Sequence, residues 1–193
     1  MVGRGLGPTA ASHRRSVARN VDWRFIEKRL PISEQMCNLA AMTSEEFHAL
    51  VEEYGEPVPE AGGDKPLTLA RIAEIERERG VKFPAFYKEF LSRYGAGYVR
   101  DALVLSPDPK SRFPCWETSG QVKNRECNFM GVIEYESNYY GFLIEQGVCS
   151  NDIWDADHDF DFEIGDSPYK DFFDLVAKIG LGVWDDEADE DDE

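Results

Sequence analysis

One segment of the sequence holds most of the side chains that could do chemistry. Between residues 152 and 163, acidic side chains alternate with apolar ones, and His158 lies among them. Alternating carboxylates could hold a cation, but a calcium loop needs glycine at its sixth position and glutamate at its twelfth. Counted from Asp155, these positions hold Phe160 and Asp166. The pattern therefore favours a solvated strand and turn over a metal site.

The same segment offers one candidate general base. His158 could accept a proton beside Asp155 or Asp157, but no nucleophile lies near it in the sequence, and sequence proximity does not define a catalytic triad. A surface histidine is the favoured interpretation, and a metal-dependent hydrolase is the least favoured function. We expect no catalytic residue, no metal and no cofactor.

The cysteines also argue against a metal site. No Cys-x-x-Cys pair is present and no histidine stands at ligand spacing, so a zinc site is not indicated. Reduced thiols without a secretory leader are typical of a cytoplasmic protein, which is the expected location. The four cysteines are Cys37, Cys115, Cys127 and Cys149.

Charge narrows the choice of partner. The net charge is −17, yet residues 1–41 hold seven basic and three acidic side chains, so the remainder carries −21. Such an acidic body repels nucleic acid and anionic membranes and attracts basic proteins. No apolar run approaches the roughly 18 residues that span a bilayer. We expect a basic protein partner, although acidity that only keeps a protein soluble is equally common.

Both ends of the chain differ from its middle. Residues 1–41 are basic and have no apolar period, which predicts a disordered extension or a mis-annotated start, with Met1, Met36 and Met42 as candidate first residues. Residues 183–193 form an acidic tail that is also predicted to be disordered. A single domain is expected over residues 42–182.

Helix signals dominate the first half of that domain. Thr43 with Glu46 forms a capping-box pattern before a short helix, and Thr68 can cap a second helix that ends at Gly80. The organising stretch is residues 80–95, where Pro84 begins a third helix and aromatic residues recur every three or four positions.

The second half reads as strands followed by one helix. Short strands are predicted at 98–99 and 102–105, and residues 111–127 are expected to form a long loop with at most a short strand. Three strand-sized runs follow, at 129–135, 139–145 and 148–154. Ser167 and Pro168 are predicted to open a last helix that stops at Gly180. The predicted fold class is α+β, with N-terminal helices packed on an antiparallel β-meander and a C-terminal helix.

Four pieces of the chain, taken in order, resemble a known family. They are the helix end through Ile75 to Gly80, the Phe83-Pro84 helix, the strand pair around residues 140–148, and the Trp154-to-His158 segment with its following helix. Over roughly residues 67–180 the sequence resembles the SUKH superfamily, which contains bacterial toxin-immunity proteins and a fungal cell-wall-synthesis regulator. Phe83 stands where that family usually has leucine, and two residues separate Asp155 from His158.

The resemblance implies a non-enzymatic domain that binds a protein, often by occluding a toxin nuclease. On this interpretation an exposed strand edge presents an aromatic anchor within an acidic rim. Tyr139 and Tyr140 should face opposite sides of their strand, with one of them in the core. A regulatory scaffold is the alternative function, and removal of residues 185–193 would impair a scaffold but not toxin neutralisation. The predicted partner-binding residues are Trp154, Asp155, Asp157, His158, Asp159, Asp161 and Tyr139.

Overall fold

The computed structural model describes residues 42–122, 125–157 and 163–183. The chain divides into two units, Met1–Cys37 and Asn38–Glu193, and every described residue belongs to the second. The predicted extension at residues 1–41 and almost all of the predicted acidic tail lie outside the described residues.

The first three helices begin and end where local signals predict. Thr43 accepts a hydrogen bond from the Glu46 N–H and Glu46 reciprocates, which completes the capping box, and Thr68 caps the second helix. Gly80 ends the second helix at φ 66°, a left-handed conformation that glycine adopts without a Cβ clash. The helices are α1 (Ser44–Tyr54), α2 (Leu69–Arg79) and α3 (Ala85–Arg93).

A buried carboxylate fixes the turn between α2 and α3. Glu76 accepts hydrogen bonds from the Phe83 N–H at 3.0 Å and from the ammonium groups of Lys82 and Lys88 at 3.0 and 3.3 Å. Burial alone would raise the pKa of Glu76, but these donors lower it below its usual value. The two helices are therefore held as one hairpin, and Gly80 and Pro84 lie inside it.

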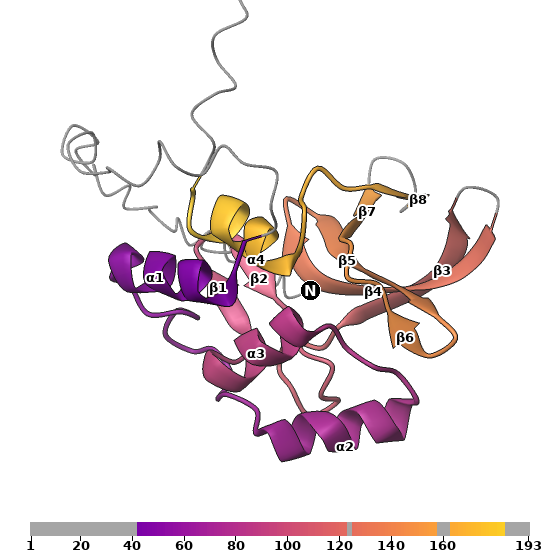
Figure 1. Ribbon diagram of the computed structural model, residues 1–193, viewed down its shortest axis with the longest axis horizontal. Coiled ribbons are helices and arrows are strands. Elements are labelled where there is room, and N and C mark those ends of the chain that lie inside the picture. Colours follow the sequence, from indigo (N-terminus) through magenta and orange to yellow (C-terminus); the bar gives the residue numbers. More distant parts are fainter. Residues whose placement is uncertain (1–41, 123–124, 158–162, 184–193) are drawn as a thin grey trace, which may run out of the picture. The chain divides into compact units, whose positions relative to one another are not determined.

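The strands form one antiparallel sheet in the order β1-β2-β4-β5-β7-β8, with β3 paired to β4 and β6 paired to β5 (Figure 1). Together with the helices, this arrangement confirms the predicted α+β fold class. The strands are β1 (Gly97–Val99), β2 (Ala102–Val104), β3 (Trp116–Val122), β4 (Arg125–Tyr135), β5 (Asn138–Glu145), β6 (Val148–Cys149), β7 (Trp154–Asp157) and β8 (Glu163–Asp166).

The predicted long loop at residues 111–127 is wrong over much of its length. Strand β3 begins at Trp116 and pairs with β4 from Trp116 opposite Gly131 to Val122 opposite Arg125. Polar residues and a glycine interrupt the strand pattern in the sequence of β3. In the structure, the burial of its side chains alternates along the strand, as it does in a strand with one covered face. Pairing with a long neighbour compensates for weak local strand propensity.

The predicted strand at 148–154 is two strands rather than one. After β6, the Ser150 hydroxyl accepts from the Leu143 N–H at 3.1 Å and donates to the Asp152 carbonyl at 2.9 Å. Such local side-chain bonds compete with the sheet ladder. The chain therefore turns away from β5 and returns to it only at β7.

The last helix starts later than Ser167. Ser167 instead accepts from the Tyr169 N–H at 3.2 Å, and Asp171 caps the helix by accepting from the Asp174 N–H at 2.9 Å. An aspartate with an extended backbone is the stronger N-cap here. The helix is α4 (Phe172–Leu175), which continues as a π-helical turn, η4 (Val176–Gly180).

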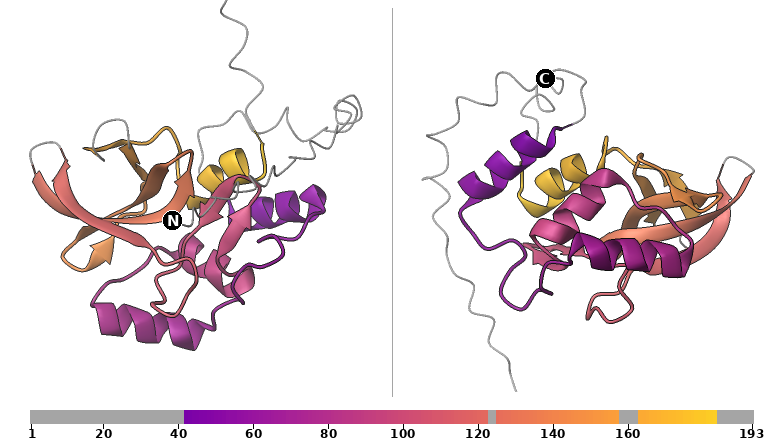
Figure 2. Two further views of the ribbon diagram at one scale, coloured as in Figure 1. Left: turned by 180° about the vertical axis from the view of Figure 1, so that it is seen from behind. Right: turned by 60° about the horizontal axis from the view of Figure 1, so that its bottom comes forward.

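Helices cover one face of the sheet, which we call the helix face (Figures 1 and 2). There, Tyr87 of α3 and Phe172 of α4 contact Phe142 of β5, with ring centroids 5.6 and 6.4 Å apart. Helix α1 adds Phe47, which stacks on Phe173 at 4.2 Å and is fully buried. This aromatic core explains why the stretch at 80–95 is apolar on one side.

The opposite face, called the inner face, carries a second hydrophobic cluster. The sheet curls, so that Ile164 of β8 lies against Gly120 of β3, where an added Cβ would be 3.0 Å from its Cδ1. Three large aromatic side chains pack against this cluster and stay half-buried, so the inner face is only partly covered. The cluster comprises Val122, Cys127, Phe129, Leu143, Ala156 and Ile164.

Candidate functional site

The structure divides the predicted binding residues between the two faces of the sheet. Trp154 and Ala156 of β7 point to the inner face, while Asp155 and Asp157 point to the helix face, because successive side chains in a strand alternate. Tyr139 lies opposite Ala156 and shares the inner face with Trp154. His158, Asp159 and Asp161 lie outside the described residues.

Strand β7 is also not the strand edge that was expected. It pairs with β5 on one side and with β8 on the other, from Trp154 opposite Asp166 to Asp157 opposite Glu163. The acidic run folds back on itself as two strands, so its first half is enclosed within the sheet. The backbone of β7 is therefore paired on both sides, and only its side chains project from the sheet.

Three aromatic residues from three strands form what we call the aromatic site: Trp116, Tyr139 and Trp154. The rings of Trp116 and Tyr139 are stacked, with centroids 4.6 Å apart and planes 11° apart, and Phe129 meets Trp116 edge-on at 6.0 Å. All three members are half-buried against the inner cluster. The hydrophobic cluster of the inner face is therefore bordered by three aromatic side chains that are only partly covered.

Glycines allow these rings to lie close to the backbone. The pairing register sets one row across five strands, in which two glycines separate two tryptophans. An added Cβ at Gly131 would lie 3.1 Å from the Tyr139 Cβ, so the absence of a side chain there makes room for the stack. The row runs Trp116, Gly131, Gly141, Trp154 and Asp166.

Carboxylates flank the aromatic site on two sides. Glu134 lies directly opposite Tyr139 on β4, and Asp166 lies opposite Trp154 on β8. Burial raises the pKa of Tyr139, and the charge of Glu134, which hydrogen-bonds its hydroxyl, raises it further. The site therefore joins flat apolar surface to negative charge.

The helix-face side of β7 has a different character. Asp155 lies opposite Tyr140, whose ring meets Tyr169 edge-on at 5.4 Å. Burial, and then the charge of Asp157, raises the pKa of Asp155 to about 6. Its Oδ1 atom is buried, with no hydrogen-bond partner among the described residues. Tyr140 is the buried member of the Tyr139–Tyr140 pair, as alternation requires.

This environment predicts how stability depends on pH. The neutral form of Asp155 is favoured in the folded state, so ionisation removes stability as the pH rises from about 4 through 6. Since the side chain is only half-buried, we expect Asp155→Asn to raise the free energy of unfolding by about 1 kcal/mol near pH 7.5. The gain should vanish near pH 3, where the aspartate is protonated in both states.

Urea unfolding at the two pH values measures the effect. The exposed Asp152, on the segment before β7, supplies the control, because its asparagine variant should change stability by less than ~0.5 kcal/mol. An Asp155→Asn variant that loses stability near neutral pH would contradict the assignment.

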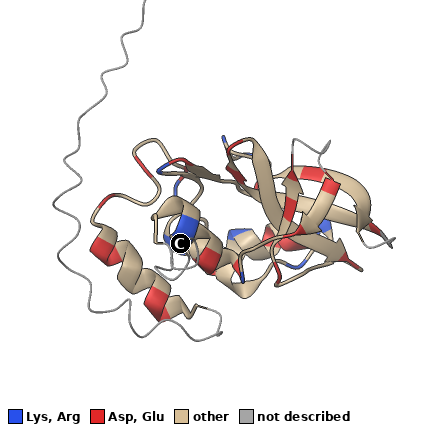
Figure 3. Ribbon diagram, turned by 90° about the horizontal axis from the view of Figure 1, so that it is seen from above, with Lys and Arg blue, Asp and Glu red and all other residues tan. Residues whose placement is uncertain are grey.

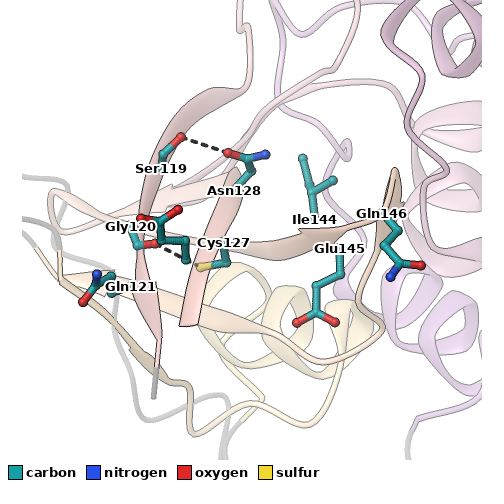
Figure 4. A pocket seen from close by; sticks show the side chains of 9 residues that line it. Ser119, Gly120, Gln121, Cys127, Asn128, Ile144, Glu145 and Gln146 are labelled. Carbon is teal, nitrogen blue, oxygen red and sulfur yellow. Dashed lines mark hydrogen bonds between the residues drawn. The ribbon is translucent and has the colours of Figure 1, made fainter. Parts of the chain in front are cut away.

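A polar groove lies on the helix face where the sheet extends past the helices (Figure 4). Ser119 of β3 and Asn128 of β4 are hydrogen-bonded at 2.9 Å in its floor, and Glu145 and Gln146 lie at its β5 side. The hollow measures about 710 Å³, and a second of about 640 Å³ continues it to Arg79 at the end of α2. The lining of the first hollow is mainly polar and includes no aromatic residue.

One cluster of catalytic residue types lies between α1 and α3. Ser44 Oγ and Glu89 Oε1 both lie against His48 Nε2, at 3.3 and 2.8 Å, while His48 Nδ1 bonds the Tyr94 hydroxyl at 2.7 Å. A hydrolytic triad needs the nucleophile and the acid on opposite ring nitrogens. Here both lie at one nitrogen, so the cluster is suited to fastening α1 to α3.

The cysteine thiols are poorly placed for nucleophilic chemistry. Burial raises the pKa of both Cys115 and Cys149 to about 12, which keeps them neutral. Within the ranges that the structure describes, no group of three or more His, Cys, Asp or Glu residues could hold a metal ion. No helix in these ranges is long and apolar enough to cross a membrane.

Trp116 is the site residue that sequence reasoning missed. It lies in the stretch that was expected to be a loop, and nothing in its neighbourhood marks it as a partner of Tyr139. The available signal was the period of two, in which Trp116, Thr118, Gly120 and Val122 share one face.

Comparison with known proteins gives one match. The sequence model of the SMI1 / KNR4 family (SUKH-1) matches residues 66–175, more than half of the chain, from just before α2 to the end of α4. No curated protein and no solved structure matches the chain. The family is known in immunity proteins and cell-wall regulators, and its members are generally non-catalytic and bind partner proteins. The chain, with its helix hairpin and curled antiparallel sheet, belongs to the SMI1 / KNR4 family (SUKH-1).

Proposed function

We propose that this protein is an immunity-type binding protein that neutralises a basic toxin domain by occlusion. The observation that carries the proposal is the aromatic site, a half-buried surface of Trp116, Tyr139 and Trp154 flanked by carboxylates. Partly exposed tryptophan and tyrosine are the residues that most often anchor protein interfaces. Family membership supports binding over catalysis.

Charge supports a basic partner. Acidic positions recur along α1 and the strands (Figure 3), and the whole chain carries a net charge of −17. The negative electrostatic potential of these charges accelerates the encounter with a positively charged protein and disfavours the binding of nucleic acid. In this proposal Tyr139 and Trp154 anchor the partner. The acidic rim beside these anchors comprises Glu134 and Asp166, whereas Asp155 and Asp157 project from the opposite face of the sheet. The other predicted contacts, His158, Asp159 and Asp161, lie outside the described residues.

Co-expression tests the proposal. Basic candidate toxin domains from the neighbouring genes are produced in cells with and without the full chain, and growth and complex formation by gel filtration are measured. Wild-type protein should restore growth and form a stable complex. Trp154→Ala should weaken the complex by at least tenfold, since truncation of a central aromatic anchor typically costs ~2 kcal/mol or more.

Leu69→Ala is the matched control. Leu69 is an exposed large apolar residue on α2, on the helix side of the sheet and away from the aromatic site, with 67% of its surface accessible. Its variant should protect as well as wild type. A folded Trp154→Ala protein that still protects fully would contradict the site, and the absence of any complex would contradict the function.

A regulatory scaffold is the second candidate, because the family is also known in cell-wall regulators. Removal of residues 185–193 separates the two functions. Toxin neutralisation should survive this deletion, whereas a scaffold that uses the tail for its contacts should lose its function.

A further inference from the structure

We propose that the aromatic site binds the guanidinium group of an arginine side chain on the basic partner. The inference rests on the proposed function, which it makes more specific by naming the chemical group that is recognised. It follows from three features of the site: a rigid aromatic stack, a neighbouring tryptophan and two flanking carboxylates.

The stack provides a flat and preorganised surface. Trp116 and Tyr139 are nearly parallel, 4.6 Å apart, and Phe129 supports Trp116 from its edge. Gly131 beneath the stack leaves no side chain that could displace the rings. A planar, weakly hydrated guanidinium stacks on such a surface better than an ammonium group does.

Trp154 bounds the site from the neighbouring strand. It is the diagonal neighbour of Tyr139 across the β5–β7 pair, because Tyr139 lies opposite Ala156 and Trp154 lies two residues earlier. Diagonal neighbours lie about 7–8 Å apart, within the reach of aromatic side chains. A planar cation can therefore contact rings that project from two adjacent strands.

The carboxylates supply the hydrogen-bond acceptors that a guanidinium group requires in addition to the rings. Arginine carries five N–H donors and no acceptor, so its recognition needs acceptors in the plane of the group. Glu134 lies beside Tyr139, and Asp166 lies beside Trp154. The same carboxylates repel the phosphate of a nucleotide, which argues against a stacked base as the occupant.

Titration of the purified full-length protein with small probes tests the proposal. The probe is arginine amide, and the control is citrulline amide, which has nearly the same shape but a neutral ureido group in place of the guanidinium. Adenosine monophosphate represents a stacking base. Indole N–H signals are followed in ¹⁵N spectra and assigned with single Trp→Phe variants. Arginine amide should shift the Trp116 and Trp154 signals, with a Kd on the order of 10 mM.

Variants locate the binding. Glu134→Gln should weaken arginine amide binding by about threefold to tenfold, since it removes one charge-assisted contact. Glu163→Gln, on the opposite side of the same sheet, should leave it unchanged. Trp116→Leu removes one ring of the stack and should abolish the binding of arginine amide. If this variant fails to fold, the wild-type titration and the Glu134→Gln comparison still decide the question.

Three results would overturn the inference. They are the absence of shifts at about 100 mM arginine amide, ten times the expected Kd, equal shifts with citrulline amide, and shifts with the nucleotide alone. None of these results bears on the co-expression experiment. If the protein protects against the toxin but does not bind arginine amide, the proposed function stands, and only the assignment of the aromatic site to arginine is rejected.

Discussion

Replacing Gly141 by alanine is expected to reduce the free energy of unfolding by about 3 kcal/mol. An added Cβ at Gly141 would lie 2.0 Å from the Met130 carbonyl oxygen and 2.8 Å from the Gly131 Cα. Both atoms belong to the backbone of β4, next to the irregularity in the β4–β5 register after Gly131. A rotamer change cannot relieve this clash, so the two central strands must separate.

Gly165→Ala is the matched control for this variant. Gly165 lies on β8 of the same sheet, and a Cβ added there meets nothing within 4 Å. Its alanine variant should therefore lie within ~0.5 kcal/mol of wild type. Urea unfolding followed by circular dichroism measures both. A Gly141→Ala protein of wild-type stability would show that β4 and β5 do not approach so closely at this point.

A loss of about 4 kcal/mol is expected for Phe47→Ala. Phe47 is fully buried, stacks on Phe173 at 4.2 Å and contacts Phe90 at 6.1 Å. Its removal leaves a cavity between α1, α3 and α4 that these helices cannot close by small shifts. The same urea titration, with the exposed Glu53→Ala on the same helix as control, measures the loss.

This variant also tests the extent of the domain. Helix α1 precedes the family match, which begins at residue 66. If α1 belongs to the cooperative unit, Phe47→Ala must destabilise the whole protein in one transition. A loss below ~1 kcal/mol would instead indicate that α1 folds separately and that the proposed start of the domain at residue 42 is wrong.

Helix boundaries were predictable because their causes are local. Thr43 and Thr68 cap helices through N–H groups three residues away, and Gly80 ends a helix through its own backbone freedom. The helix beginning was misplaced only at Ser167, where two local signals competed and Asp171 made the better cap. Reasoning from neighbouring residues succeeds when one local candidate is clearly stronger.

Strand β3 was not predictable in the same way. Within residues 116–122, the strand-forming Trp116, Thr118 and Val122 are separated by glutamate and glycine, which are depleted in strands, and by serine and glutamine. Their strand is stabilised by pairing with β4 along its whole length and by Ile164 from β8, which lies far away in the sequence. Contacts of this kind become visible only when the chain is folded.

The candidate site contains one feature that the sequence predicted and one that it could not predict. The alternation in the sequence at residues 154–157 already separates Trp154 from Asp155 onto opposite faces, because the strand period is two. The sequence could not say that both faces are covered, one by helices and the other by the curl of the sheet itself. It therefore predicted an open acidic edge where the structure has an enclosed strand.

By itself, then, the sequence determined the helix hairpin at residues 80–95, the α+β class and the family resemblance, since these depend on short-range spacing and residue type. Only the tertiary structure brought Trp116 onto Tyr139, placed Glu134 and Asp166 beside the rings, and enclosed β7 between β5 and β8. The physical reason is strand pairing, because its register joins residues that no local interaction could connect.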